Sequence, residues 1–479
     1  MDIKNISVFE NRCLINGEWL TAATLLDVKN PVDDTVLTQV PVLDDVVIHR
    51  VIQDADRAQK AWKQVAPAER SQVLKQWFHL VMQHQEELAT IMTLEQGKPL
   101  KEAKGEITYA ASYIEWFSEE AKRAYGDIIP AASSSEILVF KEAIGVCAAI
   151  TPWNFPAAMI TRKVAPALAA GCSIIVKPAS ETPLTALALA KLAVQAGVPA
   201  GVLNVVTGSS TKIGQILTAS SVVKKLSFTG STEVGAQLMA QCAPTIKKLS
   251  LELGGNAPVI VFNECDLEQA VQGVMDTKFR NAGQTCVCAN RIYVQSSIYD
   301  EFIVRLKAKV EALKLGNGLE DGTDIGPLIN RKAIQKVEEY IQDALSKGAT
   351  LVCGQESNDS QWCQPTVVRD VTQEMLCATE ETFGPFAPVF RFEHEAEVIE
   401  MANDTEFGLA SYLFTQNLNQ FLRVSRALEY GMVGVNTGLI SNAAAPFGGV
   451  KSSGIGREGS RYGLDDYLEM KYVCVGNIN

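Results

Sequence analysis

Residues 144–180 read IGVCAAITPWNFPAAMITRKVAPALAAGCSIIVKPAS, in which two short apolar runs flank a stretch of helical composition. The runs VCAAI and SIIVK have the length of buried strands, and TRKVAPALAAG between them is long enough for a helix. Parallel strands need a crossover of this kind, whereas antiparallel strands need only a tight turn. The stretch therefore predicts a βαβ unit and a parallel sheet.

The alternation of strands and helices extends over most of the chain. Further apolar runs read LNVVTG, KLSFTG, KLSLELG and APVIVF, with helical segments among them. A second α/β series follows Val259, with helices expected near residues 266–280, 297–313, 331–347, 394–404 and 417–429. Ahead of the sheet, apolar residues at three- and four-residue spacing predict helices over residues 44–123, with a break at residues 96–99. A single core stops growing at roughly 250–300 residues, so a chain of 479 residues predicts at least two domains.

Two β-rich segments lie at the margins of these series. Residues 136–150 can form a strand ahead of the βαβ unit, and residues 468–475 form another after the last glycines. Such segments often pair between subunits, and they can equally be edge strands of a sheet.

Composition excludes several classes of protein. A net charge of −12 repels phosphate backbones and anionic lipids, which disfavours a nucleic-acid or membrane-surface role. The longest apolar run, residues 164–176, is shorter than the roughly 20 residues of a membrane-spanning helix. The first residues show neither the apolar core of a signal peptide nor the composition of a transit sequence. We therefore expect a cytoplasmic protein that binds neither nucleic acid nor membrane.

Residues 281–290, NAGQTCVCAN, place Cys286 and Cys288 one residue apart. A metal site, a structural disulfide and one reactive thiol with a companion are the three possible uses of such a pair. The metal site is the weakest, because no CxxC occurs and the four histidines lie far from the pair. The eleven cysteines are an odd number, and several lie inside apolar runs, as reduced thiols do.

The best candidate for a phosphate site is KLSFTGSTEVG, residues 225–235. A strand here ends at Gly230 and Ser231, and a helix is expected to begin at Ser231 or Thr232. A helix N-terminus presents unpaired N–H groups and a positive dipole end to a pyrophosphate. A plain βα turn with a good N-cap explains the motif equally well. The one GxGxxG, at residues 454–459, does not follow a strand of a βαβ unit, so we interpret it as a turn-rich loop.

Two other motifs follow predicted strands, at the edge where open α/β sheets bind ligands. VKPASETP puts Lys177 and Ser180 at such an edge, where a ribose or phosphate partner is favoured over a lysine that reaches out to solvent. TPWNFP holds Asn154 between two prolines, so its amide can donate to a developing oxyanion, or the segment can be only a turn.

SLELGG carries Glu252 between two leucines on a predicted strand. If the carboxylate is desolvated, its raised pKa suits a general base near neutral pH, whereas a position on the solvent face of an edge strand gives it no such role. No histidine lies near any of these motifs and GxSxG is absent, so a Cys/His hydrolase finds no local support. The base has to be a carboxylate.

Taken together, seven motifs occur in the order and at about the spacing of the aldehyde dehydrogenase superfamily, which the chain resembles over nearly its whole length. These motifs are PWNFP, VKPAS, FTGSTEVG, LELGG, GQTCVCAN, EETFGP and PFGGVKSSGIGREG. Longer strings such as KFRNAGQTCVCANR and EYGMVGVNTGLISN resemble the bacterial members that oxidise succinate semialdehyde.

The resemblance implies a thioester mechanism. Cys286 is then the nucleophile, and the Asn154 amide and the Cys286 N–H hold the oxyanion. Glu252 activates the water that hydrolyses the thioester, and Lys177 is carried over with the catalytic set. Residues that match cofactor contacts of the superfamily are Trp153, Asn154, Lys177, Pro178, Ala179, Ser180, Gly230, Ser231, Leu253, Glu381 and Phe383. The uncharged Ser180 stands where NAD-preferring relatives carry an acid, so we expect NADP to be preferred, with NAD possible and no metal.

For the substrate, the resemblance assigns the far carboxylate to Arg162, Arg280 and Ser441. Arg280 can instead cap its helix and pair with an acid. Succinate and glutarate semialdehyde differ by one methylene and are not ranked by the sequence. Relatives with the same CVC string suggest a Cys286–Cys288 link on oxidation, while Cys288 can also be a small buried residue beneath the loop.

The implied fold is α/β, with a Rossmann-type parallel-sheet cofactor domain at residues 1–123 and 144–253 and an α/β catalytic domain at residues 254–465. A small β arm for oligomerisation, at residues 124–143 and 466–479, implies a homodimer or homotetramer. Two other functions stay open. In one, CoA takes the acyl group, against which Glu252 argues. In the other, the fold is kept without the chemistry, against which the intact Cys286, Glu252, Asn154 and Lys177 argue.

Overall fold

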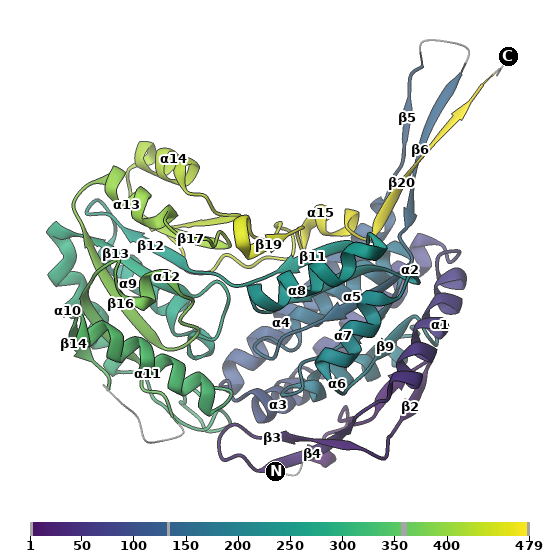
Figure 1. The fold of residues 1–479 in the computed structure, drawn as a ribbon, viewed down its shortest axis with the longest axis horizontal. Helices are drawn as coiled ribbons and strands as arrows, with labels where there is room; N and C mark the ends of the chain where they lie inside the picture. The colour runs from purple at the N-terminus through teal and green to yellow at the C-terminus, as the bar shows by residue number, and fades with distance from the viewer. Residues whose placement is uncertain (1–2, 132–134, 356–361, 477–479) are drawn as a thin grey trace.

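The computed structural model describes residues 3–131, 135–355 and 362–476. Two α/β lobes lie side by side, and a narrow β arm projects from one of them (Figure 1). The predicted α/β fold with parallel sheets is confirmed. Within the described part of the chain, no helix is long and apolar enough to span a membrane.

The first lobe contains an eight-stranded sheet in the described residues, with the order β19-β11-β10-β7-β8-β9-β1-β2. The strands of its parallel centre are β7 (Val146–Ile150), β8 (Ser173–Lys177), β9 (Leu203–Val205), β10 (Val223–Thr229) and β11 (Lys248–Glu252). Antiparallel edges are formed by β1 (Cys13–Ile15) with β2 (Glu18–Leu20) and by β19 (Gly454–Ile455). A separate hairpin pairs β3 (Leu25–Lys29) with β4 (Val36–Pro41).

Helices cover this sheet and bury its centre. The crossover α5 (Ala158–Ala170) connects β7 to β8 as predicted, and every one of its residues is buried. The other helices are α1 (Asp45–Trp62), α2 (Pro67–Gln83), α3 (Gln85–Gln96), α4 (Leu100–Glu120), α6 (Pro183–Gln195), α7 (Ser210–Ala219) and α8 (Thr232–Cys242). The expected break at residues 96–99 separates α3 from α4. It brings α4 against α5, next to the loop that follows β7.

The second lobe has a seven-stranded sheet in the described residues, with the order β14-β15-β16-β13-β12-β17-β18. Its strands are β12 (Ala257–Val261), β13 (Ala289–Gln295), β14 (Thr350–Cys353), β15 (Thr366–Val371), β16 (Phe386–Phe392), β17 (Ala410–Phe414) and β18 (Met432–Val435). The five expected helices are present as α9 (Leu267–Lys278), α10 (Tyr299–Glu311), α11 (Arg331–Ser346), α13 (Glu395–Asn403) and α14 (Leu418–Ala427), with the short α12 (Leu376–Thr379) in addition. The chain passes from β11 of the first sheet to β12 of the second through residues 253–256.

The arm is an antiparallel sheet of β5 (Asp127–Ile129), β6 (Glu136–Ala143) and β20 (Leu468–Val475), in which β6 pairs with both others. Residues 132–134 and 477–479 of the predicted arm lie outside the described residues. The prediction of one strand over residues 136–150 is wrong. The segment divides into β6 and β7, which belong to different sheets, because the backbone turns at Gly145 with a φ of +129°.

The predicted domain boundaries stay predictions. One observation concerns the catalytic domain predicted at residues 254–465. Within that range, β19 pairs with β11 of the first sheet, and α15 (Ser460–Asp465) packs against α5 of the first lobe. The loop interpretation of residues 454–459 holds apart from the two residues of β19.

Candidate functional site

A cavity of about 280 Å³ lies between the two lobes, and we call it the interlobe cavity. Segments that are far apart in the sequence meet around it. The predicted residues that line it are Trp153, Asn154, Gly230, Ser231, Leu253, Cys286, Glu381 and Phe383. Seven of these are predicted cofactor contacts, and Cys286 is the predicted nucleophile. The fold thus brings together side chains from the end of β7, the end of β10, the β11–β12 crossing and two loops of the second lobe.

Cys286 also lines a second space of about 20 Å³, the inner cavity, together with Arg162, Arg280 and Ser441. Its thiol is half-buried and lies where the interlobe and inner cavities meet. Burial raises the pKa of Cys286 to about 12, although the charges of Arg162 and Arg280 oppose the shift. The three predicted substrate residues therefore surround one side of the thiol, and the predicted cofactor residues surround the other.

The loop that carries Cys286 is held by a close approach to the β11–β12 crossing. A Cβ on Gly255 would lie 2.5 Å from the carbonyl oxygen of Cys286, so only glycine fits there. In the same crossing, the N–H of Gly255 donates to Glu381 Oε1 at 3.1 Å. Burial raises the pKa of Glu381 to about 8.

Cys288 faces away from the cavities. It is 1% exposed, and its Sγ lies 3.3 Å from Nζ of Lys278, which is also buried. Its N–H donates to the carbonyl of Thr285 across a turn. This position fits the interpretation of Cys288 as a small residue packed beneath the loop. The Cys286–Cys288 link stays a prediction. The described residues contain no group of side chains that can hold a metal ion.

Asn154 lies in the rigid loop after β7 and is 5% exposed. Its side-chain Nδ2 donates to the carbonyl of Gln284 at 3.0 Å, and its Oδ1 accepts from the N–H of Phe155 at 3.1 Å. An amide nitrogen carries two N–H groups, so one remains for a group in the interlobe cavity that Asn154 lines. The amide is therefore held in place by the segment that precedes Cys286.

Glu252 is the last residue of β11, which lies between β10 and β19. The alternative that Glu252 lies on the solvent face of an edge strand is therefore wrong. The side chain is 2% exposed, and neither carboxylate oxygen has a hydrogen-bond partner among the described residues. Burial raises the pKa of Glu252 well above its ordinary value, and Glu458 raises it further against the charges of Arg162 and Lys163. A raised pKa makes this carboxylate a stronger base than an ordinary one.

Glu458 and Lys163 are two members of the site that the sequence analysis did not single out. Lys163 donates to Glu458 and, at 2.7 Å, to Thr229 Oγ1, and Arg162 Nε lies 2.8 Å from Glu458 Oε2. All three charged side chains are buried. The sequence signal that could have identified Glu458 was its position as the acid within GIGREG, which we interpreted only as a loop.

Arg162 is thus already paired on one side, and its guanidinium lies 3.9 Å from the centroid of the Phe447 ring. Burial opposes its charge, but Glu458 holds the pKa of Arg162 above its ordinary value. Its Nη2 has no hydrogen-bond partner in the part of the chain that the structure describes. A buried cation with an unpaired N–H group beside the thiol is suited to an anionic substrate group.

Arg280 is half-buried and forms no ion pair with an acid within residues 3–131, 135–355 and 362–476. The alternative in which Arg280 caps its helix and pairs with an acid therefore has no support. Arg280 and Ser441 also line a third space of about 290 Å³, which we call the outer cavity. Its other lining residues include Lys98, Glu102, Glu106, Tyr109 and Phe155. The inner and outer cavities share Tyr109, Phe155, Arg280 and Ser441 as lining residues.

Lys177, Pro178, Ala179 and Ser180 do not line the interlobe cavity. Lys177 is the last residue of β8, pairs in register with Ile150 of β7 and is 2% exposed. The alternative that Lys177 reaches out to solvent is therefore wrong. Its Nζ donates to Ser210 Oγ at 2.6 Å and lies 3.5 Å from Ser180 Oγ. Burial lowers the pKa of Lys177 to about 8, although Glu181 opposes the shift. Ser210, at the start of α7, is a further polar group that the sequence analysis missed.

The prediction that a helix begins at Ser231 or Thr232 is confirmed, since α8 begins at Thr232. Ser231 is the N-cap of α8, and its hydroxyl accepts from the N–H of Val234. Helix α8 therefore points its N-terminus at the interlobe cavity, where a negatively charged group is favoured.

Comparison with known proteins gives a consistent result. Residues 19–473 match the model of the aldehyde dehydrogenase family. The chain is 58% identical to the succinate-semialdehyde dehydrogenase [NADP(+)] GabD of Escherichia coli strain K12, over 99% of this chain and 100% of that protein. It is also 58% identical to a glutarate-semialdehyde dehydrogenase of Pseudomonas putida, with the same coverage. A crystal structure of an aldehyde dehydrogenase from Brucella melitensis biovar abortus superimposes with a TM-score of 0.99 at 57% identity, over 100% of both chains.

Proposed function

The chain belongs to the aldehyde dehydrogenase family, and we propose that it oxidises succinate semialdehyde to succinate with NADP⁺. The observation that carries this proposal is the position of Cys286, which lines both the interlobe cavity and the inner cavity. One cavity has polar groups suited to a nicotinamide nucleotide, and the other presents two arginines to a small aldehyde acid. A thiol between them can react with the aldehyde while the hydride acceptor lies on the opposite side.

The residues present fit a dinucleotide. The N-terminus of α8 faces the interlobe cavity, Glu381 offers a carboxylate to a ribose hydroxyl, and Trp153 and Phe383 pack edge to face at 5.7 Å beside them. Lys177 and the hydroxyls of Ser180 and Ser210 cluster at the end of β8. An ammonium group among hydroxyls suits the 2′-phosphate of NADP, and the nearby acid Glu181 is exposed. The NADP named for the Escherichia coli relative supports this preference.

Chemistry begins at Cys286. Its sulfur adds to the aldehyde carbon once the thiol has lost its proton to water, and Arg162 and Arg280 favour the thiolate that burial disfavours. The oxygen that becomes negative is stabilised by the free N–H of the Asn154 amide and by the N–H of Cys286. When bound, NADP⁺ supplies the acceptor for the hydride that leaves the carbon, and Cys286 then carries a thioester.

Glu252 completes the reaction. Its carboxylate is buried beside positive charges and has no hydrogen-bond partner among the described residues. In this position it can take a proton from the water that attacks the thioester, and Cys286 leaves as the thiolate. This role favours hydrolysis over transfer of the acyl group to CoA.

Substrate choice follows from charge. Arg280 and the unpaired side of Arg162 face the inner cavity with Ser441 and bind the carboxylate at the far end of the aldehyde. A neutral aldehyde of the same length leaves both arginines without an anion, which lowers its affinity.

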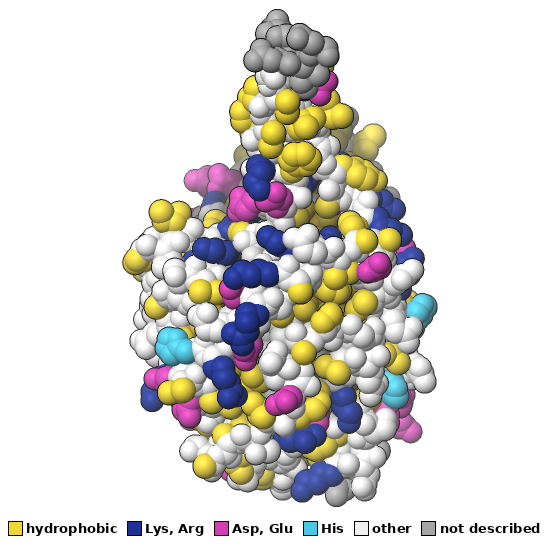
Figure 2. Space-filling view, turned by 90° about the vertical axis from the view of Figure 1, so that its right-hand side faces the viewer, with side chains coloured by type: hydrophobic (Ala, Val, Ile, Leu, Met, Phe, Trp, Pro, Cys, Tyr) yellow, Lys and Arg dark blue, Asp and Glu magenta, His cyan; other side chains and the backbone are white. Residues whose placement is uncertain are grey.

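The β arm supports a homo-oligomer. Its exposed apolar side chains include Ile128 at 80%, Met470 at 76% and Tyr472 at 64%, and Figure 2 shows hydrophobic side chains gathered on the projection. An exposed apolar sheet whose outer strands, β5 and β20, pair on one side only within the described residues is suited to a second copy of the chain. We propose a homodimer or homotetramer, and a cytoplasmic location also stays a prediction.

The function is tested by following NADPH formation with succinate semialdehyde. We expect turnover by the wild type, none by Cys286→Ala, and a higher kcat/KM with NADP⁺ than with NAD⁺. Glutarate semialdehyde is measured beside it, because one methylene is worth only about 1–3 kcal/mol of discrimination. A higher kcat/KM for glutarate semialdehyde would change the substrate assignment, and a clear NAD⁺ preference would contradict the cofactor assignment.

Replacing Glu252 by glutamine separates the two halves of the reaction. We expect a burst of one NADPH per site in quenched flow, followed by steady-state turnover reduced about 10²- to 10⁴-fold, the usual contribution of a general base. A base acts when deprotonated, so wild-type turnover should rise with pH through the raised pKa of Glu252. Glu301→Gln, at an exposed site on α10, is the control. Unchanged steady-state turnover in Glu252→Gln would remove Glu252 from the mechanism.

Replacing Arg280 by alanine tests recognition of the carboxylate. KM for succinate semialdehyde should rise about 10- to 100-fold, in line with roughly 1.5–3 kcal/mol for a hydrogen bond between charged groups. KM for propanal, which has no carboxylate, should change little. Arg305→Ala, half-exposed on α10, controls for loss of a surface charge. Equal effects on both aldehydes would refute the assignment.

The arm is tested by the mass of the particle in solution. Light scattering should show a dimer or tetramer for the wild type and a smaller particle for the double variant Ile128→Glu, Met470→Glu. Val304→Glu changes a side chain that is 67% exposed on α10, away from the arm, and should leave the mass unchanged. A monomeric wild type would contradict the proposal.

A further inference from the structure

A buried ion pair lies next to the site but belongs to none of the catalytic motifs. Lys98 Nζ and Glu106 Oε2 are 2.5 Å apart, and the two residues are 2% and 4% exposed. Lys98 lies in the turn between α3 and α4, and Glu106 lies on α4. Removing two charges from water costs several kcal/mol for each ion, so such a pair needs further partners. The identity of those partners indicates its role.

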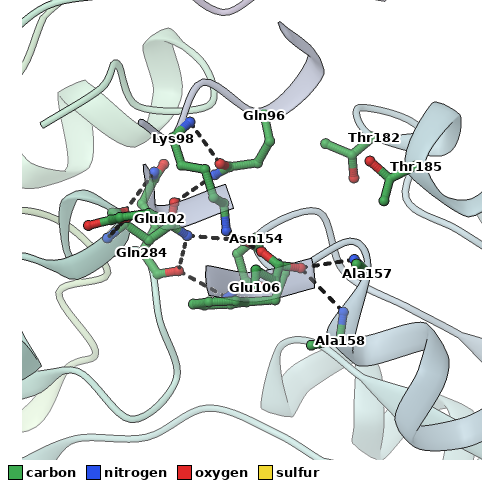
Figure 3. A network of polar contacts seen from close by, with 12 residues as sticks. Gln96, Lys98, Glu102, Glu106, Asn154, Ala157, Ala158, Thr182, Thr185 and Gln284 are labelled. Atoms are coloured by element: carbon green, nitrogen blue, oxygen red, sulfur yellow. Dashed lines mark hydrogen bonds and ion pairs between the residues drawn. The ribbon is translucent and has the colours of Figure 1, made fainter. Parts of the chain in front are cut away.

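Both charged groups bind the loop that carries Asn154 (Figure 3). Lys98 Nζ donates to the backbone carbonyl of Asn154 at 2.8 Å. Glu106 Oε1 accepts from the N–H groups of Ala157 and Ala158 at 2.9 and 3.3 Å. Helix α5 has no side-chain cap of its own at Ala157, so Glu106 caps it from the neighbouring helix. The pair therefore holds this loop at Asn154 and at the start of α5.

The same loop is held from the segment before Cys286. Asn281 Nδ2 donates to the carbonyl of Asn154 at 3.0 Å and to the carbonyl of Gln284 at 3.1 Å. Gln96 Nε2, from the end of α3, donates to Asn281 Oδ1 at 3.0 Å. The Asn154 carbonyl thus accepts from Lys98 and Asn281 together, while the Asn154 side chain donates to Gln284. The hydrogen bonds that join Asn154 to the segment before Cys286 belong to this network.

We propose that Lys98 and Glu106 are positioning residues that set the Asn154 amide for stabilisation of the oxyanion on the substrate. The proposal rests on the proposed function, since it assigns the pair a part in the step at Cys286. Lys98 acts through the backbone of Asn154, and Glu106 acts through the backbone of residues 157 and 158. Because α5 also carries Arg162, Glu106 holds the start of the helix that presents this arginine to the thiol.

Two other roles for the pair predict different measurements. A purely structural pair would lower the melting temperature of a variant and leave the rate constant of its folded sites unchanged. A substrate-binding Lys98, whose side chain lines the outer cavity, would raise KM for the carboxylate-bearing aldehyde. A positioning pair lowers the rate constant of NADPH formation at saturating substrate and changes KM little.

The test is a double-mutant cycle between Lys98→Met and Asn154→Ala, with the single-turnover rate of NADPH formation as its readout. In the wild-type background, Lys98→Met should lower this rate about 10- to 100-fold, because a displacement of about 1 Å can cost about 100-fold. In the Asn154→Ala background, where the amide is absent, it should lower the rate less than about twofold, since coupled residues act as one unit. Equal fold-losses in both backgrounds, or a loss confined to KM, would overturn the proposal.

Further variants separate positioning from stability. Glu106→Gln keeps an oxygen acceptor for the two N–H groups and should retain more of the rate than Glu106→Leu, which removes it. If Lys98→Met leaves Glu106 uncompensated and does not fold, the double variant Lys98→Met, Glu106→Leu removes both charges and is used in the cycle. Lys225→Met is the control, since Lys225 is equally buried but binds Ser250 and should lower only the melting temperature.

The proposed function can fail independently of this inference. The cycle is run with whichever aldehyde the wild type oxidises, so a different substrate does not affect it. Activity that survives Cys286→Ala would overturn the proposed function, because the nucleophile would then be elsewhere. Loss of activity in Cys286→Ala, combined with no coupling between Lys98 and Asn154, would overturn only the inference.

Discussion

The site depends on the close approach of two backbones. Residues 253–256 carry the chain from the first sheet to the second, and at Gly255 they pass so near the Cys286 carbonyl that a Cβ would lie 2.5 Å from it. This contact fixes the cysteine loop of one lobe against the end of β11 in the other. Because Glu252 immediately precedes the crossing, its carboxylate lies near enough to Cys286 for its charge to add to the rise in the thiol pKa that burial causes. A side chain at residue 255 would require one of the two backbones to shift.

Buried charge surrounds this contact on both sides. Arg162, Lys163 and Glu458 form one cluster beside Glu252, and Lys98 with Glu106 forms another beside Asn154. Ion pairing within each cluster offsets part of the cost of burial, and the cluster of Arg162, Lys163 and Glu458 keeps one excess positive charge. The Cys286 thiol and the Glu252 carboxyl form no such ion pair, and burial raises the pKa of both groups. Compensated charges hold the scaffold, and uncompensated groups are left to react.

Prediction from the sequence succeeded where local pattern carries the information. The alternation of apolar runs and helical segments predicted β7, α5 and β8, and the serine before a helical stretch predicted the N-cap of α8. It failed where a pattern spans two structural contexts, as at residues 136–150, which look continuous but divide between the arm and the first sheet. It also set aside GIGREG as a loop, although the loop contributes the buried Glu458. Lys98 and Glu106 gave no local signal, because their partners lie about 50 residues away.

The sequence by itself determined the class of fold, the positions of most elements and a set of chemically suited residues, because these follow from periodicity, capping and motif order along the chain. Only the tertiary structure decided which of those residues share a cavity, that Glu252 is buried between strands and that Cys288 faces away from the site. The physical reason is that burial, electrostatic coupling and close backbone approach depend on segments that are distant in the sequence. Such contacts are defined only when the two sheets come together.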